Sequence, residues 1–146
     1  DRREDTFAAG LSMGGYGAFK LGLRASDTYS AVASLSGAVD LVSILADRPE
    51  RNPITEGVFG DLSKVKGSDN DLFYLAEKLA ASGKPLPKMY QWCGTEDFLY
   101  EGNLRMRDHL KSLGYDLTYE ESPGDHQWKY WDEKIQTVLE WLPIGK

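Results

Sequence analysis

The feature that most constrains the fold of this chain is the alternation of short strand-like segments with longer helix-like ones. Four segments rich in apolar or β-prone residues are separated by helical patterns, and they comprise residues 6–11, 31–36, 87–93 and 116–121. Apolar residues at helical spacing indicate helices over residues 14–23, 71–79, 103–113 and 128–142. Because strands that alternate with helices are typical of a parallel sheet covered by helices, the sequence predicts an α/β fold. The alternating polarity of residues 116–121 predicts an edge strand.

Residues 39–69 lack this regularity. We expect a long irregular segment there, with a helical turn near residues 41–45, because the pattern is interrupted at Pro49, Pro53, Gly57, Gly60 and Gly67. Long loops in a compact domain are often lids or binding segments.

Length and composition indicate one globular domain. The chain has 146 residues, of which 41% are hydrophobic and 27% charged, and it is too short for two domains of ordinary size. The net charge of −6 argues against a nucleic-acid or anionic-membrane partner. No segment approaches the roughly 18 apolar residues of a membrane span, and the charged residues 1–5 precede no apolar signal region. We therefore expect a cytoplasmic protein.

The single cysteine, Cys93, excludes an internal disulfide bond. It has no histidine or cysteine at metal-ligand spacing, so we expect no metal site and interpret Cys93 as a small buried residue.

Residues 10–14, Gly-Leu-Ser-Met-Gly, match the pattern G-x-S-x-G between a predicted strand and a predicted helix. In this context Ser12 is expected to adopt a positive φ that exposes its hydroxyl, while Gly10 and Gly14 let the strand approach the helix. Gly15 and Ala18 are also small, so this face of the helix carries no bulky side chains. Backbone N–H groups at the start of the helix could stabilise an oxyanion beside the serine.

A catalytic serine needs a base and an acid, and the chain has only two histidines. His109 lies within a helical pattern, which favours a surface role, whereas His126 follows the last predicted strand in a turn-rich loop. The acid is expected directly after the third strand, where Glu96 and Asp97 are the candidates, and we favour Asp97. Asp125 is poorly placed to reach the ring of its neighbour. The order serine, acid, histidine is that of the α/β-hydrolases.

Four strings carry a more specific resemblance: AAGLSMGGYGAFKLGL, AVASLSGAVD, WCGTEDFLYEGN and SPGDHQWKYW. They resemble the C-terminal half of the esterase D-like family of α/β-hydrolases, in particular bacterial tributyrin and acetyl esterases. The similarity runs from about residue 6 to residue 143. It implies that residues 1–146 form a single partial α/β-hydrolase domain, with a mostly parallel sheet and flanking helices, in a bacterial protein.

The resemblance also implies a role for individual residues. Ser12 would be the nucleophile, Asp97 the acid, His126 the base, and the backbone N–H of Met13 one oxyanion donor. Residues implied at the substrate pocket or its rim are Trp92, Phe98, Leu99 and Trp128, for which a place in the core is an equally good interpretation.

The implied function is a serine carboxylesterase that hydrolyses short-chain acyl esters, such as acetyl or butyryl esters, through an acyl-enzyme. This chemistry requires neither a cofactor nor a metal. The alternatives are an S-formylglutathione hydrolase, which cleaves a thioester, and a non-catalytic esterase-like fragment.

The chain differs from the family pattern before Ser12. In the full fold several strands precede the nucleophile, whereas eleven residues precede Ser12. One of the earlier loops supplies the second oxyanion N–H, and loss of such a donor typically costs about 10²–10³ in rate. Residues 6–11 would then form an apolar sheet edge. We therefore expect a companion N-terminal segment or a homo-oligomer.

Overall fold

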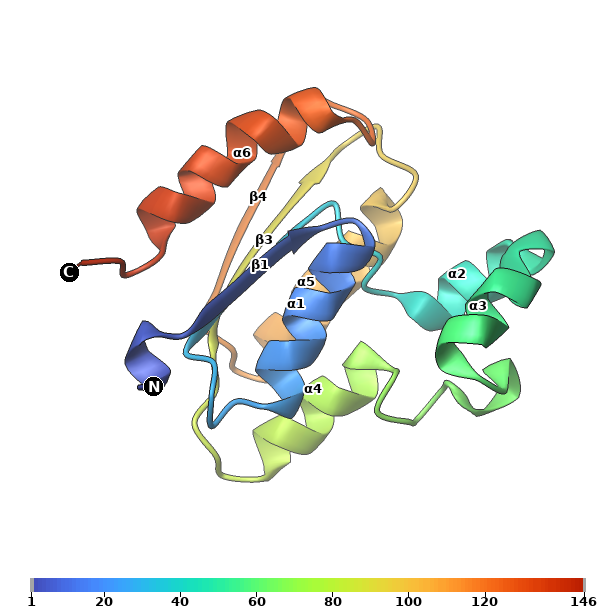
Figure 1. The fold of residues 1–146 in the computed structure, drawn as a ribbon, viewed down its shortest axis with the longest axis horizontal. Helices are drawn as coiled ribbons and strands as arrows, with labels where there is room; N and C mark the ends of the chain where they lie inside the picture. The colour runs from blue at the N-terminus through green and yellow to red at the C-terminus, as the bar shows by residue number, and fades with distance from the viewer. Residues whose placement is uncertain (1, 146) are drawn as a thin grey trace.

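The computed structural model describes residues 2–145, and its centre is a parallel β-sheet (Figure 1). The strands follow the order β1-β2-β3-β4 and comprise β1 (Phe7–Leu11), β2 (Ala31–Leu35), β3 (Lys88–Gly94) and β4 (Leu117–Ser122). Leu11 pairs with Leu35, and Leu35 pairs with Trp92, so β1 and β2 end at the same level, while β3 continues to Gly94, which pairs with the last residue of β4. The predicted α/β fold is therefore confirmed, and so is the edge position of β4.

Helices cover both faces of the sheet (Figure 1). One face carries α1 (Met13–Arg24), α4 (Leu72–Ala81) and α5 (Tyr100–Ser112), and the other carries α6 (Trp128–Trp141). Alternate residues of β2 enter the two cores, since Val32 packs with the three helices and Ala33 packs with α6. Helix α5 begins three residues before the predicted start at residue 103. Within residues 2–145, no helix combines the length and apolarity that crossing a membrane requires.

The prediction that residues 39–69 are largely irregular is wrong, whereas the helical turn expected near residues 41–45 is confirmed. They contain α2 (Leu41–Asp47), α3 (Asn52–Phe59) and the 3₁₀ turns η2 (Pro49–Arg51) and η3 (Leu62–Lys64). We call residues 41–64 the helical excursion, and it projects from the body of the molecule (Figure 1). Asp40 caps α2 by accepting the backbone N–H of Ser43, and Asp61 caps η3 in the same way. Pro53 lies in the first turn of α3, where a proline costs no helical hydrogen bond.

Helix α6 departs from the prediction in how its apolar residues are used. The pattern predicts one apolar face, but only half of that set is buried, namely Trp131, Val138 and Leu142. The exposed half comprises Trp128, Ile135 and Leu139. The sheet therefore covers only part of the apolar face of α6, and the rest of that face is exposed.

Candidate active site

Ser12 lies at the sharp turn between β1 and α1, with φ of 54° and ψ of −120°. This positive φ is what the G-x-S-x-G pattern predicts, and it is strained for any residue with a side chain. The turn is fixed by its backbone, because the N–H of Ser12 donates to Leu35 (3.0 Å) and its carbonyl accepts from Ala38 (3.1 Å). The backbone of β2 and of the loop that follows it therefore holds the strained residue in place.

Small residues are needed around the turn, but not at every predicted position. A Cβ at Gly10 would overlap the backbone carbonyl of Gly14, so β1 and α1 can approach only if residue 10 is glycine. A Cβ at Gly15 would meet Gly37 Cα at 2.9 Å, which supports the predicted slim surface of α1. By contrast, a Cβ at Gly14 would meet no atom of residues 2–145 within 4 Å, the backbone of its own helix aside. Within these residues nothing requires residue 14 to be small, contrary to the expectation.

Ser12, Asp97 and His126 follow the carboxyl ends of β1, β3 and β4, and their side chains are in hydrogen-bond contact. His126 Nε2 lies 2.9 Å from Ser12 Oγ, and His126 Nδ1 lies 2.8 Å from Asp97 Oδ2. The other oxygen of Asp97 accepts the backbone N–H of Leu99 at 2.9 Å. With the proton on Nδ1, the imidazole donates to Asp97 and presents Nε2 to the serine hydroxyl.

Burial distinguishes the two ends of this hydrogen-bonded chain. The side chain of Asp97 has no exposed surface, whereas 22% of the His126 side chain is exposed. The carboxylate is therefore shielded from water, while the imidazole can be reached by a small molecule in solution. Such a gradient suits a group that exchanges protons with a substrate and is oriented from behind.

Glu96, the other candidate acid, has a different set of partners. Its Oε2 accepts the backbone N–H of Gly124 at 2.6 Å and the hydroxyl of Thr95 at 2.6 Å. These two hydrogen bonds, that of Gly124 first, lower the pKa of Glu96 below its usual value. Glu96 therefore joins the acid turn (residues 94–99) to the histidine loop (residues 123–127), and Asp97 is the carboxylate that contacts His126.

The acid turn and the histidine loop also meet through their backbones. The N–H of Glu96 donates to the carbonyl of Gly124 at 3.0 Å, and the N–H of Thr95 donates to Ser122 at 3.1 Å. A Cβ at Gly94 would overlap that same Gly124 carbonyl. The two loops that supply the acid and the base are thus one hydrogen-bonded unit.

Two aromatic side chains enclose the imidazole of His126. Its ring centroid lies 4.9 Å from that of Phe98 and 4.8 Å from that of Trp131, both in edge-to-face geometry. The indole N–H of Trp131 donates to Ser36 Oγ at 2.9 Å, and Ser36 itself has a positive φ of 48°. Sequence reasoning did not identify Ser36 or Trp131 as site residues, although Ser36 directly follows β2 at the same edge of the sheet.

Met13 is the first residue of α1. Its backbone N–H has no carbonyl four residues earlier in the helix, and it lies directly after the serine. This is the position from which a helix N-terminus can donate to an anion.

The residues expected at the substrate pocket divide between core and surface. Trp92 is fully buried, and its indole N–H donates to Ser122 Oγ at 2.9 Å, so it belongs to the core and not to a pocket rim. Leu99 is also buried. Phe98 and Trp128 are 52% and 72% exposed, and both remain candidates for contact with a substrate.

A groove of about 280 Å³ opens between the β1 edge and α6, beside Ser12. Its walls carry Gly10 and Leu11 from β1 and Trp128, Trp131 and Ile135 from the last helix.

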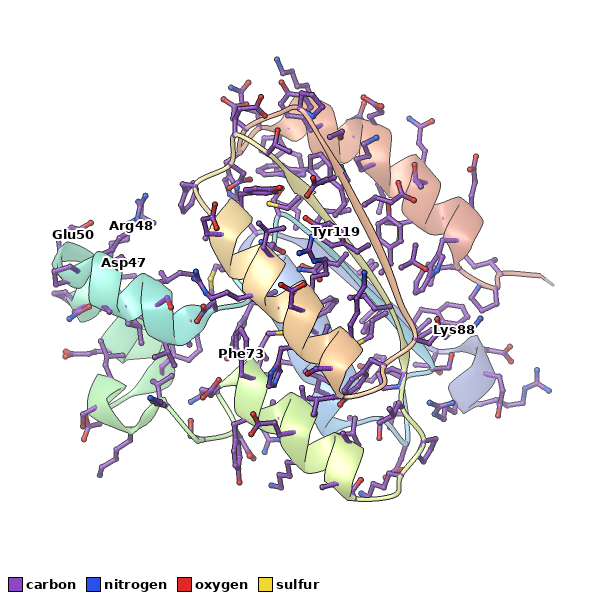
Figure 2. The ribbon with its side chains drawn as sticks, turned by 180° about the vertical axis from the view of Figure 1, so that it is seen from behind. Asp47, Arg48, Glu50, Phe73, Lys88 and Tyr119 are labelled. Atoms are coloured by element: carbon purple, nitrogen blue, oxygen red, sulfur yellow. The ribbon has the colours of Figure 1, made fainter. Side chains whose placement is uncertain are left out.

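The remaining candidates of the sequence take no part in the hydrogen-bonded chain of Ser12, His126 and Asp97. His109 Nε2 lies 3.1 Å from the carbonyl of Phe73, which Figure 2 labels on α4. Asp125 accepts from Gln127 and not from His126. Cys93 is buried, and its burial raises its pKa. In the part of the chain that the structure describes, no group of three His, Cys, Asp or Glu residues could hold a metal ion.

A parallel sheet flanked by helices, with a positive-φ serine between a strand and a helix and with an aspartate and a histidine after later strands, is an α/β-hydrolase arrangement. Residues 1–142 match the model of the Esterase family, described as "Putative esterase". The chain belongs to this family.

Individual relatives agree with the family assignment. The chain is 38% identical to an acetyl esterase of Caldicellulosiruptor saccharolyticus over 97% of its own length and 55% of the relative. It is also 38% identical to two solved Staphylococcus aureus structures, an S-formylglutathione hydrolase (TM-score 0.86) and a fluorophosphonate-binding serine hydrolase (TM-score 0.87). In both cases the match covers 97% of this chain and 55% of the other. The chain thus spans about half the length of these relatives.

Proposed function

We propose that the protein is a serine carboxylesterase that hydrolyses short-chain acyl esters with Ser12, Asp97 and His126. The observation that carries this proposal is the hydrogen-bonded chain from Asp97 through His126 to the strained Ser12. Serine is a weak nucleophile on its own, and a base at hydrogen-bond distance activates it. The acetyl esterase at 38% identity supports a small acyl group.

In the proposed mechanism, Ser12 Oγ attacks the ester carbonyl while its proton passes to His126 Nε2. The backbone N–H of Met13 donates to the oxyanion, and Asp97 stabilises the imidazolium that forms. The tetrahedral intermediate then collapses: its C–O bond to the alcohol breaks, and His126 returns the proton to the departing alkoxide. Water repeats the same steps on the acyl-enzyme, releasing the carboxylic acid and regenerating Ser12.

A fluorophosphonate probe tests the proposal directly, because only an activated serine reacts with it. We expect the protein to be labelled and Ser12→Ala to abolish both labelling and ester hydrolysis. Wild-type protein that stays unlabelled would favour the non-catalytic alternative. Activity is also expected to fall as the pH is lowered from about 8 to about 5, because a protonated imidazole cannot accept the serine proton. A flat profile would contradict His126 as the base.

A second candidate is thioester hydrolysis, which the likeness to the S-formylglutathione hydrolase favours. The same serine chemistry would serve, with a thiolate in place of an alkoxide as the leaving group. Comparison of kcat/KM for nitrophenyl acetate and for S-formylglutathione separates the two functions. A preference for the thioester of a hundredfold or more would replace the carboxylesterase assignment.

We further propose that a companion segment of the same protein pairs with β1. Strand β1 forms one edge of the sheet within residues 2–145, and the groove beside it carries the exposed side chains of Trp128 and Ile135. Apolar edges of this kind are normally covered. The segment would occupy this groove and could supply a second oxyanion donor, whose loss typically costs about 10²–10³ in rate.

Intact mass and specific activity test the companion segment together. We expect full activity only from preparations in which additional polypeptide accompanies these residues. Full esterase activity from a species with the mass of these 146 residues alone would refute the proposal. A cytoplasmic location belongs to the same proposal, and cell fractionation tests it.

A further inference from the structure

The helical excursion contacts the candidate active site through one arginine. Arg48 follows α2, and its guanidinium carbon lies 4.5 Å from the ring centroid of Phe98. The Phe98 ring in turn contacts the imidazole of His126. Arg48 is therefore one aromatic ring away from the proposed base, although the two residues are far apart in the sequence.

The charge of Arg48 has no carboxylate partner within residues 2–145. No ion pair involves its guanidinium, although Asp47 and Glu50 lie close by in the sequence, on the same part of the excursion (Figure 2). Arg105, in contrast, is paired with Asp40 at 2.7 Å. The guanidinium of Arg48 thus packs on the Phe98 ring beside the candidate active site, and its positive charge is available to an anion.

An arginine packed over an aromatic ring retains N–H donors for an anion. The guanidinium carbon of Arg48 lies over the Phe98 ring, and a guanidinium carries five N–H donors, more than one ring face can accept. An arginine held in this way can bind a carboxylate through two parallel hydrogen bonds, and part of its side-chain entropy has already been lost on stacking. Phe98 therefore preorganises Arg48 for an anion.

The direction of the proposed reaction indicates which part of a substrate would reach Arg48. His126 Nε2 must protonate the departing alcohol or thiol, so the leaving group lies against the imidazole. Phe98 contacts the same imidazole, and the guanidinium of Arg48 packs over the Phe98 ring. A leaving group that extends from the ester past His126 along Phe98 would bring its distal end to the guanidinium.

We propose that Arg48, held by Phe98, binds a carboxylate on the leaving group of the ester, and so makes the enzyme selective for esters of anionic alcohols or thiols. This inference rests on the proposed function and specifies its substrate class.

A neighbouring pocket places a further constraint on the anion. Phe98 also lines a pocket of about 350 Å³ whose charged lining residues are Asp40, Asp47, Glu101 and Arg105. Asp40 and Arg105 neutralise each other, which leaves two carboxylates to repel an anion. Arg48 does not line this pocket. The carboxylate of the leaving group is therefore expected at Arg48 and not in the pocket.

Three acetate and succinate esters test the inference in the full natural length of the protein. The first is 4-carboxybenzyl acetate, the second its uncharged methyl ester, and the third benzyl hydrogen succinate, which carries the carboxylate on the acyl group. We expect Arg48→Ala to lower kcat/KM about tenfold for the first ester, mainly by raising KM. The other two esters should change less than twofold. Arg48→Lys should give an intermediate loss, because an ammonium cannot form the paired hydrogen bonds.

Arg51→Ala is the matched control, since it removes a positive charge from the same excursion without touching Phe98; it should leave all three esters unchanged. The inference is overturned if Arg48→Ala slows charged and neutral esters equally, slows none of them, or slows only the succinate ester. An equal loss would mean that Arg48 acts on His126 through Phe98.

Binding of the product 4-(hydroxymethyl)benzoate separates this inference from the proposed function. Arg48→Ala should weaken its binding about tenfold in an NMR titration, with benzyl alcohol unaffected. If the wild-type protein hydrolyses none of the esters, the proposed function fails, but this titration still decides whether Arg48 binds the anion. Equal binding by wild type and variant would overturn the inference.

Discussion

A buried amide network sets the position of the acid turn, and Asn103 is its central residue. The side-chain N–H groups of Asn103 donate to the carbonyls of Gly37 (3.0 Å) and Leu99 (2.9 Å). Its Oδ1 accepts from Gln91 Nε2 at 2.8 Å. One side chain of α5 thereby joins β3, the loop after β2 and the acid turn. We expect Asn103→Ala to destabilise the fold and to loosen the acid turn.

The expected loss follows from the partners that remain. In Asn103→Ala the Gly37 carbonyl loses its only hydrogen bond within residues 2–145, and Gln91 Nε2 keeps one of its two acceptors, the backbone carbonyl of Asn103. The Leu99 carbonyl still accepts the backbone N–H of residue 103 at 3.1 Å. A buried polar group without a partner costs about 1–3 kcal/mol. The unpaired Gly37 carbonyl, together with the hydrogen bond lost from Gln91, should lower the free energy of unfolding by about 3 kcal/mol.

Urea unfolding measures this loss, with the midpoint and the slope fitted separately. Gln136→Ala is the control, because Gln136 is exposed and its amide donates to a helix carbonyl; it should change stability by less than about 0.5 kcal/mol. Gln91→Met should cost about 1 kcal/mol. It leaves Asn103 Oδ1 without its donor, but this loss is partly offset because the variant also removes Gln91 Oε1, which has no partner in the described residues. A loss below about 1 kcal/mol in Asn103→Ala would refute the network as a source of stability.

Three further predictions concern the surroundings of the site. Trp131→Phe removes the indole donor beneath His126, so kcat for nitrophenyl acetate should fall about fivefold with KM little changed; an unchanged kcat would contradict this positioning role. Gly10→Ala forces a methyl group into the α1 backbone and should lower the thermal midpoint by several degrees, whereas Gly14→Ala, which enters open space, should not. The lowered pKa of Glu96 makes its contribution present above the ordinary glutamate pKa and lost as the pH falls through the lowered value. Protection factors of the histidine-loop amides, corrected for the intrinsic pH dependence of exchange, should therefore fall below about pH 4.3 in wild type and change little there in Glu96→Gln; identical acid profiles would exclude the Glu96 contact as the cause.

The sequence predicts the sheet and the site geometry because both depend on chain order and strand ends. Short apolar strands separated by helices leave few arrangements other than a parallel sheet. In such a sheet all carboxyl ends lie at one edge, so residues that directly follow strands meet there even when they are distant in sequence. Ser12, Asp97 and His126 each follow a strand closely, and they are in hydrogen-bond contact.

Features that depend on packing between elements were not predictable in this way. The prolines and glycines of the helical excursion are spaced as in a loop, which is why a loop is predicted. In the structure, however, Pro53 lies in the first turn of α3 and Asp40 caps α2. Gly14 matches the motif, but its freedom from contact is visible only once α1 is placed on β1. Asn103 lies in a helix of low apolarity, and no local pattern indicates that its amide faces three other elements.

The exposed half of the apolar residues of α6 bears on the proposed companion segment. Six apolar residues at helical spacing predict one buried face, and the sheet covers only Trp131, Val138 and Leu142. An exposed row of Trp128, Ile135 and Leu139 would be an unfavourable use of apolar surface in a free helix. Trp128 and Ile135 line the groove at the β1 edge, so one added strand could pair with β1 and cover them at once. We therefore propose that one companion segment accounts for both the exposed row of α6 and the unpaired β1 edge of residues 2–145, and a segment that covered only one of them would leave the other exposed.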